Sequence, residues 1–245
     1  SDLNIWEIYA SITGEIYFRS SGKLFIYNTL NDQVEIILPE TTFHRLFYVN
    51  NQIFVRERGK GLKTLYRNQL LYLPEGQFFA DLTVYGILPY INNDILILTR
   101  EKGFFIYYPN GKTILNKLVY YEPFKTQADE YLAEHRVFNV NPLQNNLMAI
   151  ATGTGGLVIM NYKGEVECIA NEKSGLLNNN IRFVYQDKQQ NLWVAANDGL
   201  SYIILNTPIR IYNKSTGLPG YIYESMIYNN RSEEHTSELQ SRQSI

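Results

Sequence analysis

The chain lacks cysteine pairs, histidine clusters, long apolar runs and an excess of basic charge, and each absence excludes a class of protein. Cys168 is the single cysteine among 245 residues, which excludes an internal disulfide and a cysteine-based metal cluster. The three histidines, His44, His135 and His235, lie far apart and form no zinc-ligand spacing. No stretch approaches the roughly 18 apolar residues of a membrane-crossing helix. The net charge of −2 lacks the basic balance expected of a nucleic-acid-binding domain.

Motifs for nucleophilic or phosphate chemistry are also missing. Gly153–Gly156 is rich in glycine, but it lies between two strand-like runs and is followed by no helix and no Lys-Ser/Thr pair, both of which a phosphate loop needs. No Gly-x-Ser-x-Gly elbow occurs, so no hydrolase nucleophile can be assigned. We therefore predict no cofactor, no catalytic residue and no metal ligand.

What the chain has in abundance is aromatic sequence, with 20 tyrosines and 12 phenylalanines, and such residues suit pleated surfaces. Short apolar runs separated by turn residues recur throughout. The clearest example is Ser174–Tyr212, which contains runs at 181–185, 192–196, 200–205 and 209–212. Four runs of about five residues, joined by loops of about two to five, predict a four-stranded antiparallel meander.

A unit of strand, turn, glycine and strand repeats along the chain. The first apolar residues of its leading strand are Ile16, Ile53, Ile95, Leu147 and Leu192, at intervals of 37, 42, 52 and 45. A period of about 40 to 45 residues with four strands per repeat is typical of a β-propeller. A β-sandwich also has closely spaced strands, but it has no reason to repeat one unit five times. The predicted fold is all-β: a β-propeller fragment of five four-stranded antiparallel blades and the start of a sixth.

The repeat predicts blades at about residues 4–39, 40–76, 79–117, 136–172 and 178–213, with the next blade starting at 218. The longest interval has a local cause, because Glu122–Arg136 loses the strand pattern. Pro123 suits a first helical turn, and a helical face is shared by Ala128, Tyr131, Leu132 and His135. This pattern predicts a short helix between the third and fourth blades, with an irregular loop as the alternative.

The end of the chain differs from everything before it. Residues 231–241 match the translation of a common sequencing adapter over eleven consecutive positions, and 231–245 show no apolar period. We therefore predict that 231–245 is a non-native, disordered tail and that the propeller fragment covers 1–230. A genuine polar tail is the alternative interpretation.

The best-preserved repeat, Gly175–Ile203, resembles the two-component-regulator propeller repeat. The resemblance rests on Asp187, on Asn191-Leu192-Trp193 and on Gly199, and Thr216–Gly220 begins the next repeat in the same way. It covers mainly residues 146–220 and is weaker over the first 120. In that family, such propellers are periplasmic sensors of regulators that cross the bacterial inner membrane. A small β-sandwich with a triple-tyrosine motif and a transmembrane helix follow, and the output is a histidine kinase or a helix-turn-helix module.

The resemblance implies a periplasmic, ligand-sensing domain of an inner-membrane signalling regulator that is not itself an enzyme. Its partners would be a small-molecule or oligosaccharide ligand and the downstream sandwich and helix, without nucleic-acid binding by this part. A homodimer is left open.

The residues of the repeat motif have structural explanations. Trp193 is expected to fill the wedge between blades, and Asp187 to bond the amides of its own turn. Gly199 follows Asn-Asp, a pair that favours positive φ.

We place the candidate site on a rim instead, because turns between the second and third strands share a rim with the connections that lead into each first strand. The candidate ligand-binding residues are Arg56, Arg58, Arg100, Thr154, Asn178, Asn180, Asn197 and Asp198.

Two other functions stay open. A carbohydrate-active enzyme would need carboxylates gathered near the axis, and Glu7 and Asp187 occupy unrelated repeat positions. An interaction scaffold would be favoured by a flat, apolar rim.

Overall fold

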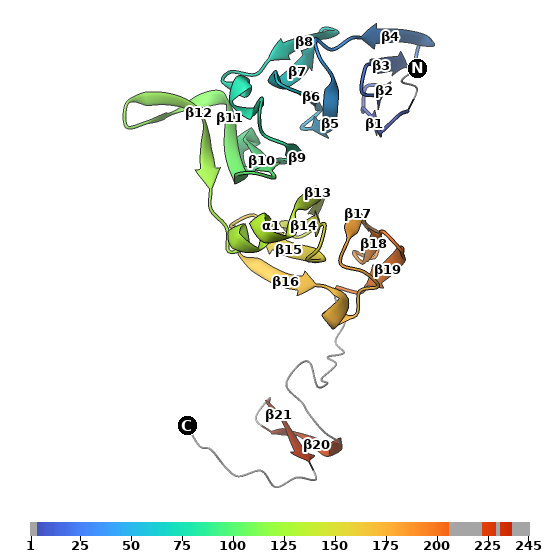
Figure 1. Cartoon of the computed structure of the whole chain (residues 1–245), viewed down its shortest axis with the longest axis vertical. Helices are drawn as coiled ribbons and strands as arrows, with labels where there is room; N and C mark the ends of the chain where they lie inside the picture. Colours follow the sequence, from blue (N-terminus) through green and yellow to red (C-terminus); the bar gives the residue numbers. More distant parts are fainter. Residues whose placement is uncertain (1–3, 206–221, 229–230, 237–245) are drawn as a thin grey trace. The chain divides into compact units, whose positions relative to one another are not determined.

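The computed structural model describes residues 4–205, 222–228 and 231–236 (Figure 1). The chain divides into two units, residues 1–204 and 205–245, which are described separately. The first unit consists of five antiparallel sheets whose strands follow chain order from one edge to the other.

Four of these sheets have four strands. The first contains β1 (Glu7–Ala10), β2 (Glu15–Arg19), β3 (Leu24–Asn28) and β4 (Gln33–Ile37). The second contains β5 (Phe43–Val49), β6 (Gln52–Glu57), β7 (Gly61–Tyr66) and β8 (Gln69–Tyr72). The third contains β9 (Val84–Pro89), β10 (Ile95–Thr99), β11 (Gly103–Ile114) and β12 (Lys117–Phe124). The fourth contains β13 (Val137–Leu143), β14 (Leu147–Thr152), β15 (Leu157–Asn161) and β16 (Val166–Ala170).

The fifth sheet has three described strands, β17 (Ile181–Gln186), β18 (Leu192–Ala196) and β19 (Gly199–Ile203). The fourth strand that the sequence predicts there, at 209–212, lies outside the described residues. The first strand of each sheet contacts the first strand of the next, in the order β1, β5, β9, β13 and β17 (Figure 1). This arrangement is a β-propeller, in which every sheet is one blade and the first strands are innermost. The predicted fold class is confirmed.

The core lies between consecutive blades. Leu24 and Leu46 belong to a cluster shared by the first and second blades, and Phe54 and Phe105 to one shared by the second and third. Leu98 and Met148 belong to a third cluster between the third and fourth blades. Because each fully buried side chain of this kind contributes about 1.5–3 kcal/mol, the blades stabilise one another through their faces.

Helical turns occupy the connections between strands. They are η1 (Gly76–Phe79), η2 (Ile91–Asn93), α1 (Asp129–His135) and η3 (Glu172–Ser174). The predicted helix between the third and fourth blades is present as α1, and Leu132 is its buried residue. The predicted place of Pro123 is wrong, because Pro123 pairs with Phe105 inside β12. The long β11–β12 hairpin therefore extends the third blade beyond residue 117.

The motif residues of the fifth blade behave in three ways. Asp187 does bond its own turn, since its Oδ1 accepts from the amides of Gln189 and Asn191 at 3.0 and 2.9 Å. Gly199 has a φ of +150°, as its turn predicts. Trp193 differs from expectation, because it is 40% exposed and its Nε1 donates to Asp187 Oδ2 at 3.2 Å.

The second unit contains β20 (Ile222–Tyr228) and β21 (Arg231–Thr236), which pair antiparallel. β20 coincides with the run that the sequence assigns to the start of a sixth blade. β21 gives residues 231–236 of the tail a strand, whereas the sequence predicts disorder there. The adapter origin of the tail stays a prediction.

Candidate ligand-binding site

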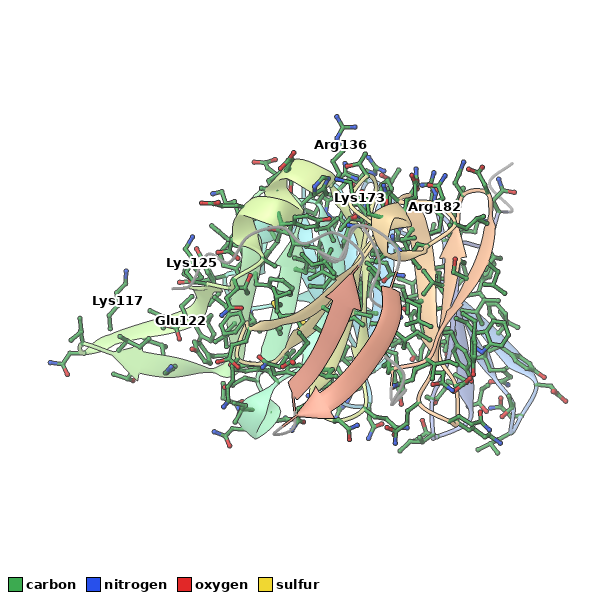
Figure 2. The ribbon with its side chains drawn as sticks, turned by 90° about the horizontal axis from the view of Figure 1, so that it is seen from below. Lys117, Glu122, Lys125, Arg136, Lys173 and Arg182 are labelled. Carbon is green, nitrogen blue, oxygen red and sulfur yellow. The ribbon has the colours of Figure 1, made fainter. Side chains whose placement is uncertain are left out.

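One rim of the propeller is held together by the same backbone hydrogen bond in blade after blade. The turn between the second and third strands donates an amide to the residue that leads into the first strand. The bonds are Arg58 N to Thr42 O at 2.9 Å, Arg100 N to Thr83 O at 2.9 Å, Gly153 N to Arg136 O at 2.9 Å, and Asn197 N to Asn180 O at 3.0 Å. These turns and connections therefore share a rim, as the sequence predicts. Figure 2 shows Arg136, Lys173 and Arg182 along this edge of the first unit, whereas Lys117 lies out on the β11–β12 hairpin.

A β-bulge opens the innermost strand at this rim in four successive blades. The register between first and second strands slips by one residue, which leaves an extra residue at His44, Tyr85, Phe138 and Arg182. Pairing of β1 with β2 shows no such slip. A bulge re-aims a side chain at the point where it occurs, and bulges are frequent beside functional sites.

The bulge has a sequence signal, which is a pair of apolar residues three positions apart. Val84 and Ile87 are both buried, and Tyr85 and Gly86 lie between them. In a regular strand, residues three apart face opposite sides. The extra residue of the bulge returns both apolar residues to the core. The same spacing recurs at Phe43 and Leu46, Val137 and Val140, and Ile181 and Val184, all buried.

The four bulged side chains contact one another in sequence, and we name them the bulge row. The rings of His44 and Tyr85 meet edge to face with centroids 5.9 Å apart, and those of Tyr85 and Phe138 at 6.3 Å. The guanidinium of Arg182 lies 4.9 Å from the centroid of the Phe138 ring. One residue from each of four blades thus forms a continuous line.

A cavity of about 520 Å³ lies beside the bulge row. Its lining includes Arg19, Arg45 and Arg58, against a single carboxylate, Glu7. Glu7 is paired with Arg19 at 2.7 Å and with Arg45 at 3.2 Å. Arg58 is exposed and forms no ion pair among the described residues. We name this space the basic cavity, since its wall carries three guanidinium groups and one acid.

The positive charge of the basic cavity acts on His44. Burial and then the charges of Arg56, Arg45, Arg58 and Arg19 lower the pKa of His44 to about 3. The imidazole is therefore neutral at physiological pH, and its two nitrogens provide one donor and one acceptor.

Buried polar atoms without partners also gather at this rim. Within the described part of the chain, such atoms are His44 Nδ1, Arg56 Nε, Arg100 Nε, Asn141 Oδ1 and Asn180 Oδ1. His44 belongs to the bulge row, Arg56 lies near the end of β6, and Arg100 and Asn180 lie in the turn and the connection of this rim. An unsatisfied buried polar group costs about 1–3 kcal/mol, so a cluster of them marks a place where an additional partner would be stabilising.

The structure brings three of the predicted site residues together and separates the others. The charges of Arg56 and Arg58 act on His44, and Arg100 lies over the Tyr85 ring, but the three arginines differ in availability. Arg56 is only 6% exposed and donates to Ala80 O at 2.9 Å. Arg100 lies 4.6 Å from the centroid of the Tyr85 ring and donates to its hydroxyl. Arg58 alone of the three lines the basic cavity.

The predicted site residues of the fifth blade bond to one another, between the connection before β17 and the turn between β18 and β19. Asn178 Nδ2 donates to Asp198 Oδ2 at 2.7 Å, and Asn178 Oδ1 accepts from Asn180 N at 2.7 Å. Asn197 accepts from Arg182 at 3.3 Å, which ties this group to one end of the bulge row. Thr154 stands apart, with its hydroxyl 2.9 Å from His135 Nδ1.

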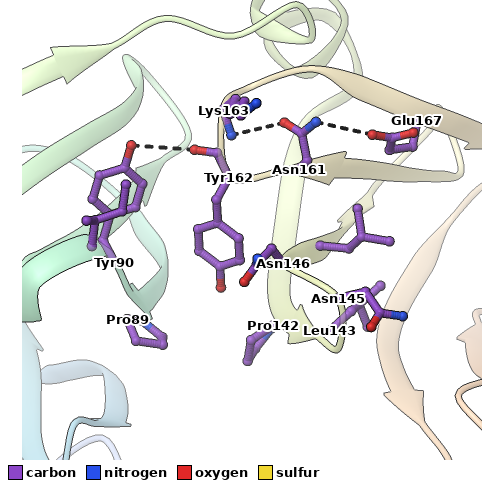
Figure 3. A pocket seen from close by; sticks show the side chains of 12 residues that line it. Pro89, Tyr90, Pro142, Leu143, Asn145, Asn146, Asn161, Tyr162, Lys163 and Glu167 are labelled. Atoms are coloured by element: carbon purple, nitrogen blue, oxygen red, sulfur yellow. Dashed lines mark hydrogen bonds between the residues drawn. The ribbon is translucent and has the colours of Figure 1, made fainter.

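A second cavity, of about 720 Å³, lies at the opposite rim between the third and fourth blades (Figure 3). Its polar groups are largely bonded to one another. Asn161 Oδ1 accepts from Lys163 N at 3.0 Å, and the Tyr90 hydroxyl reaches Tyr162 O at 3.5 Å. Among the described residues, this second cavity has neither the repeated geometry nor the buried polar atoms without partners found near the basic cavity, so we do not choose it as the candidate site.

Within the described ranges, no group of three or more His, Cys, Asp or Glu side chains could hold a metal ion. No helix in those ranges combines the length and the apolar character needed to cross a membrane.

Comparison by sequence finds no matching family model and no matching curated protein. Comparison by structure finds propellers. The chain is similar to an extracellular domain assigned to a hybrid two component system of B. thetaiotaomicron, with a TM-score of 0.56 and 18% identity over 82% of this chain and 26% of that one. A second such domain from the same organism gives a TM-score of 0.58 and 17% identity over 90% and 31% of the two chains.

A propeller enzyme, virginiamycin B lyase from Staphylococcus aureus, is also similar, with a TM-score of 0.54 and 12% identity over 98% and 89% of the two chains. These identities establish the fold alone. The chain spans about a quarter to a third of the length of the two regulator domains.

Proposed function

We propose that this chain is a ligand-sensing propeller of a bacterial transmembrane regulator and that it works in the periplasm. The observation that carries the proposal is the convergence of the bulge row and the basic cavity on one rim. Similarity to extracellular domains of two component systems supports the regulator. The partners we propose for it are a downstream β-sandwich and transmembrane helix, together with a small-molecule or oligosaccharide ligand.

A ligand in the basic cavity would touch several blades at once. Arg19 belongs to the first blade, Arg58 to the second, Tyr85 to the third and Phe138 to the fourth, and all four line the cavity. A ligand shifts a conformational equilibrium only through its different affinities for the two states. One that bridges four blades gains affinity for the arrangement that fits it. We propose that this is how occupancy reaches the output module.

The similarity to virginiamycin B lyase favours a catalytic function. The cavity opposes it, because its one carboxylate is held between Arg19 and Arg45.

The test is thermal unfolding of the 245-residue chain with a panel of neutral and acidic oligosaccharides. A ligand that binds the folded chain raises the Tm in proportion to RT ln(1 + [L]/Kd). We expect at least one oligosaccharide to raise the Tm, the rise to be smaller in Arg58→Gln, and the ligand to be recovered intact by chromatography. A panel without any Tm rise contradicts the proposal, and a cleaved ligand replaces it with a catalytic one.

A further inference from the structure

The charge balance of the basic cavity selects among ligands. Glu7 shares its two carboxylate oxygens between Arg19 and Arg45, so that acid is already neutralised by its own partners. Arg58 adds a positive charge that no described acid pairs with. Arg56 does not line the cavity, but its charge also acts on His44. The cavity thus has a net positive charge even after its internal ion pairs are formed.

The donors at the wall suit an oxyanion. A guanidinium presents a planar fork of N–H groups that matches a carboxylate or sulfate, and such charge-assisted bonds are stronger than neutral ones. His44 adds a neutral ring whose Nδ1 is buried and has no partner in the described part of the chain.

The apolar surfaces at the cavity suit a ring. Trp6 lines it and is 63% exposed, whereas Tyr85 is only 9% exposed and has the guanidinium groups of Arg45 and Arg100 over its ring. The flat face of an exposed ring such as Trp6 gives contact area to a sugar ring, while an inorganic ion would not use it.

We propose that the basic cavity binds an acidic saccharide, with its carboxylate or sulfate group at Arg58 and a sugar ring against Trp6. This inference rests on the proposed sensing function and names the class of ligand. A uronate carboxylate and a sulfate ester are both oxyanions that a guanidinium can bind, and the experiment distinguishes them.

The experiment is titration calorimetry on the 245-residue chain at low salt. The probes are trigalacturonate, galactotriose of the same length, a sulfated galactose trisaccharide and inorganic sulfate. We expect one of the two acidic trisaccharides to bind about tenfold or more tighter than galactotriose, as a charge-assisted pair at a partly desolvated site should. Inorganic sulfate should bind more weakly than that trisaccharide.

Two variants locate the binding. Arg58→Gln removes one cavity charge without removing any ion pair, and we expect it to weaken binding of the acidic trisaccharide about five- to tenfold. Lys188→Gln removes an exposed charge from the turn between β17 and β18, at the opposite rim, and should change little.

The outcomes distinguish failure of the acidic-saccharide proposal from failure of the proposed sensing function. Galactotriose that binds as tightly as both acidic trisaccharides, with an affinity that Arg58→Gln lowers, overturns the acidic class and leaves the sensing function standing. Acidic binding that is insensitive to Arg58→Gln overturns the assignment to this cavity. Absence of binding by every probe overturns the inference, and the wider Tm panel then decides the function.

Discussion

Arg45 Nη2 donates to the main-chain oxygen of Phe138 at 3.0 Å, across 93 positions of sequence. The bond joins the second blade to the fourth. Arg45 also pairs with Glu7 of the first blade, and Glu7 Oε2 accepts from Leu46 N at 3.0 Å. One side chain therefore connects three blades at the rim that carries the candidate site.

Loss of this connection should be costly to stability. Arg45→Gln leaves Glu7 with one cationic partner and removes the donor to Phe138, so we expect the free energy of unfolding to fall by about 1.5–3 kcal/mol, the range for hydrogen bonds to charged groups. Urea denaturation followed by circular dichroism measures the change. Lys188→Gln is the matched surface control, and an equal loss in both variants would show that the bond has no special role.

Acidification should weaken the fold through His44. Its pKa in the folded chain is about 3, below the usual 6.5, so the unfolded chain binds more protons between those values. Stability therefore rises with pH across that window and is lost as pH falls from 6.5 toward 3. His44→Gln should flatten the dependence between about pH 6.5 and 4.5, above the range in which ordinary carboxylates titrate. Unchanged slopes in the wild-type chain and the variant would contradict this expectation.

The bulge can be tested by removing its extra residue. Deleting Arg182 leaves the buried Ile181 and Val184 two positions apart, so a regular strand still turns both side chains toward the core. Arg182→Ala removes the same side chain and keeps the bulge. We expect the free energies of unfolding of the two variants, measured by urea denaturation, to differ by less than about 1 kcal/mol. A loss of about 2–5 kcal/mol in the deletion alone, as for deletion of a core aliphatic side chain, would contradict this account of the bulge.

The carboxylate of Asp187 should control the environment of Trp193. Its Oδ2 accepts from the indole and from the Tyr202 hydroxyl, both at 3.2 Å. Asp187→Ala should destabilise the fifth blade by about 1–2 kcal/mol because four hydrogen-bonded groups lose an acceptor. The chain has two tryptophans, so fluorescence of a Trp6→Phe background reports Trp193 alone. Asp187→Asn keeps the Oδ1 acceptor, so its stability should lie between those of the wild-type chain and Asp187→Ala.

Much of the fold follows from the sequence, because strand runs and turn residues repeat with the blade. The rim also follows, since the turn before Gly199 and the residues before Ile181 must meet in an antiparallel meander. The helix before the fourth blade is predicted, but the strand at Pro123 is not. A proline can lie in an outer strand wherever its missing N–H is not needed for pairing, and that depends on the register with the neighbouring strand.

The site is harder to predict than the fold. Arg58 lies in a predicted turn, but Arg45 and Tyr85 lie inside predicted strands, where alternation alone decides the direction of a side chain. Their convergence depends on the bulge and on which blades meet. The spacing of three between the apolar residues Val84 and Ile87 indicates the bulge. A search for strict two-residue alternation misses that spacing.

The bulges have a consequence for how such a domain could diversify. Each bulged position lies between two anchors that stay in the core, such as Val84 and Ile87 around Tyr85. The four positions already hold an imidazole, a phenol, a phenyl ring and a guanidinium. Each of the four bulged blades thus offers one position at which the side chain can change while the packing is conserved, so ligand preference could be altered by successive single substitutions.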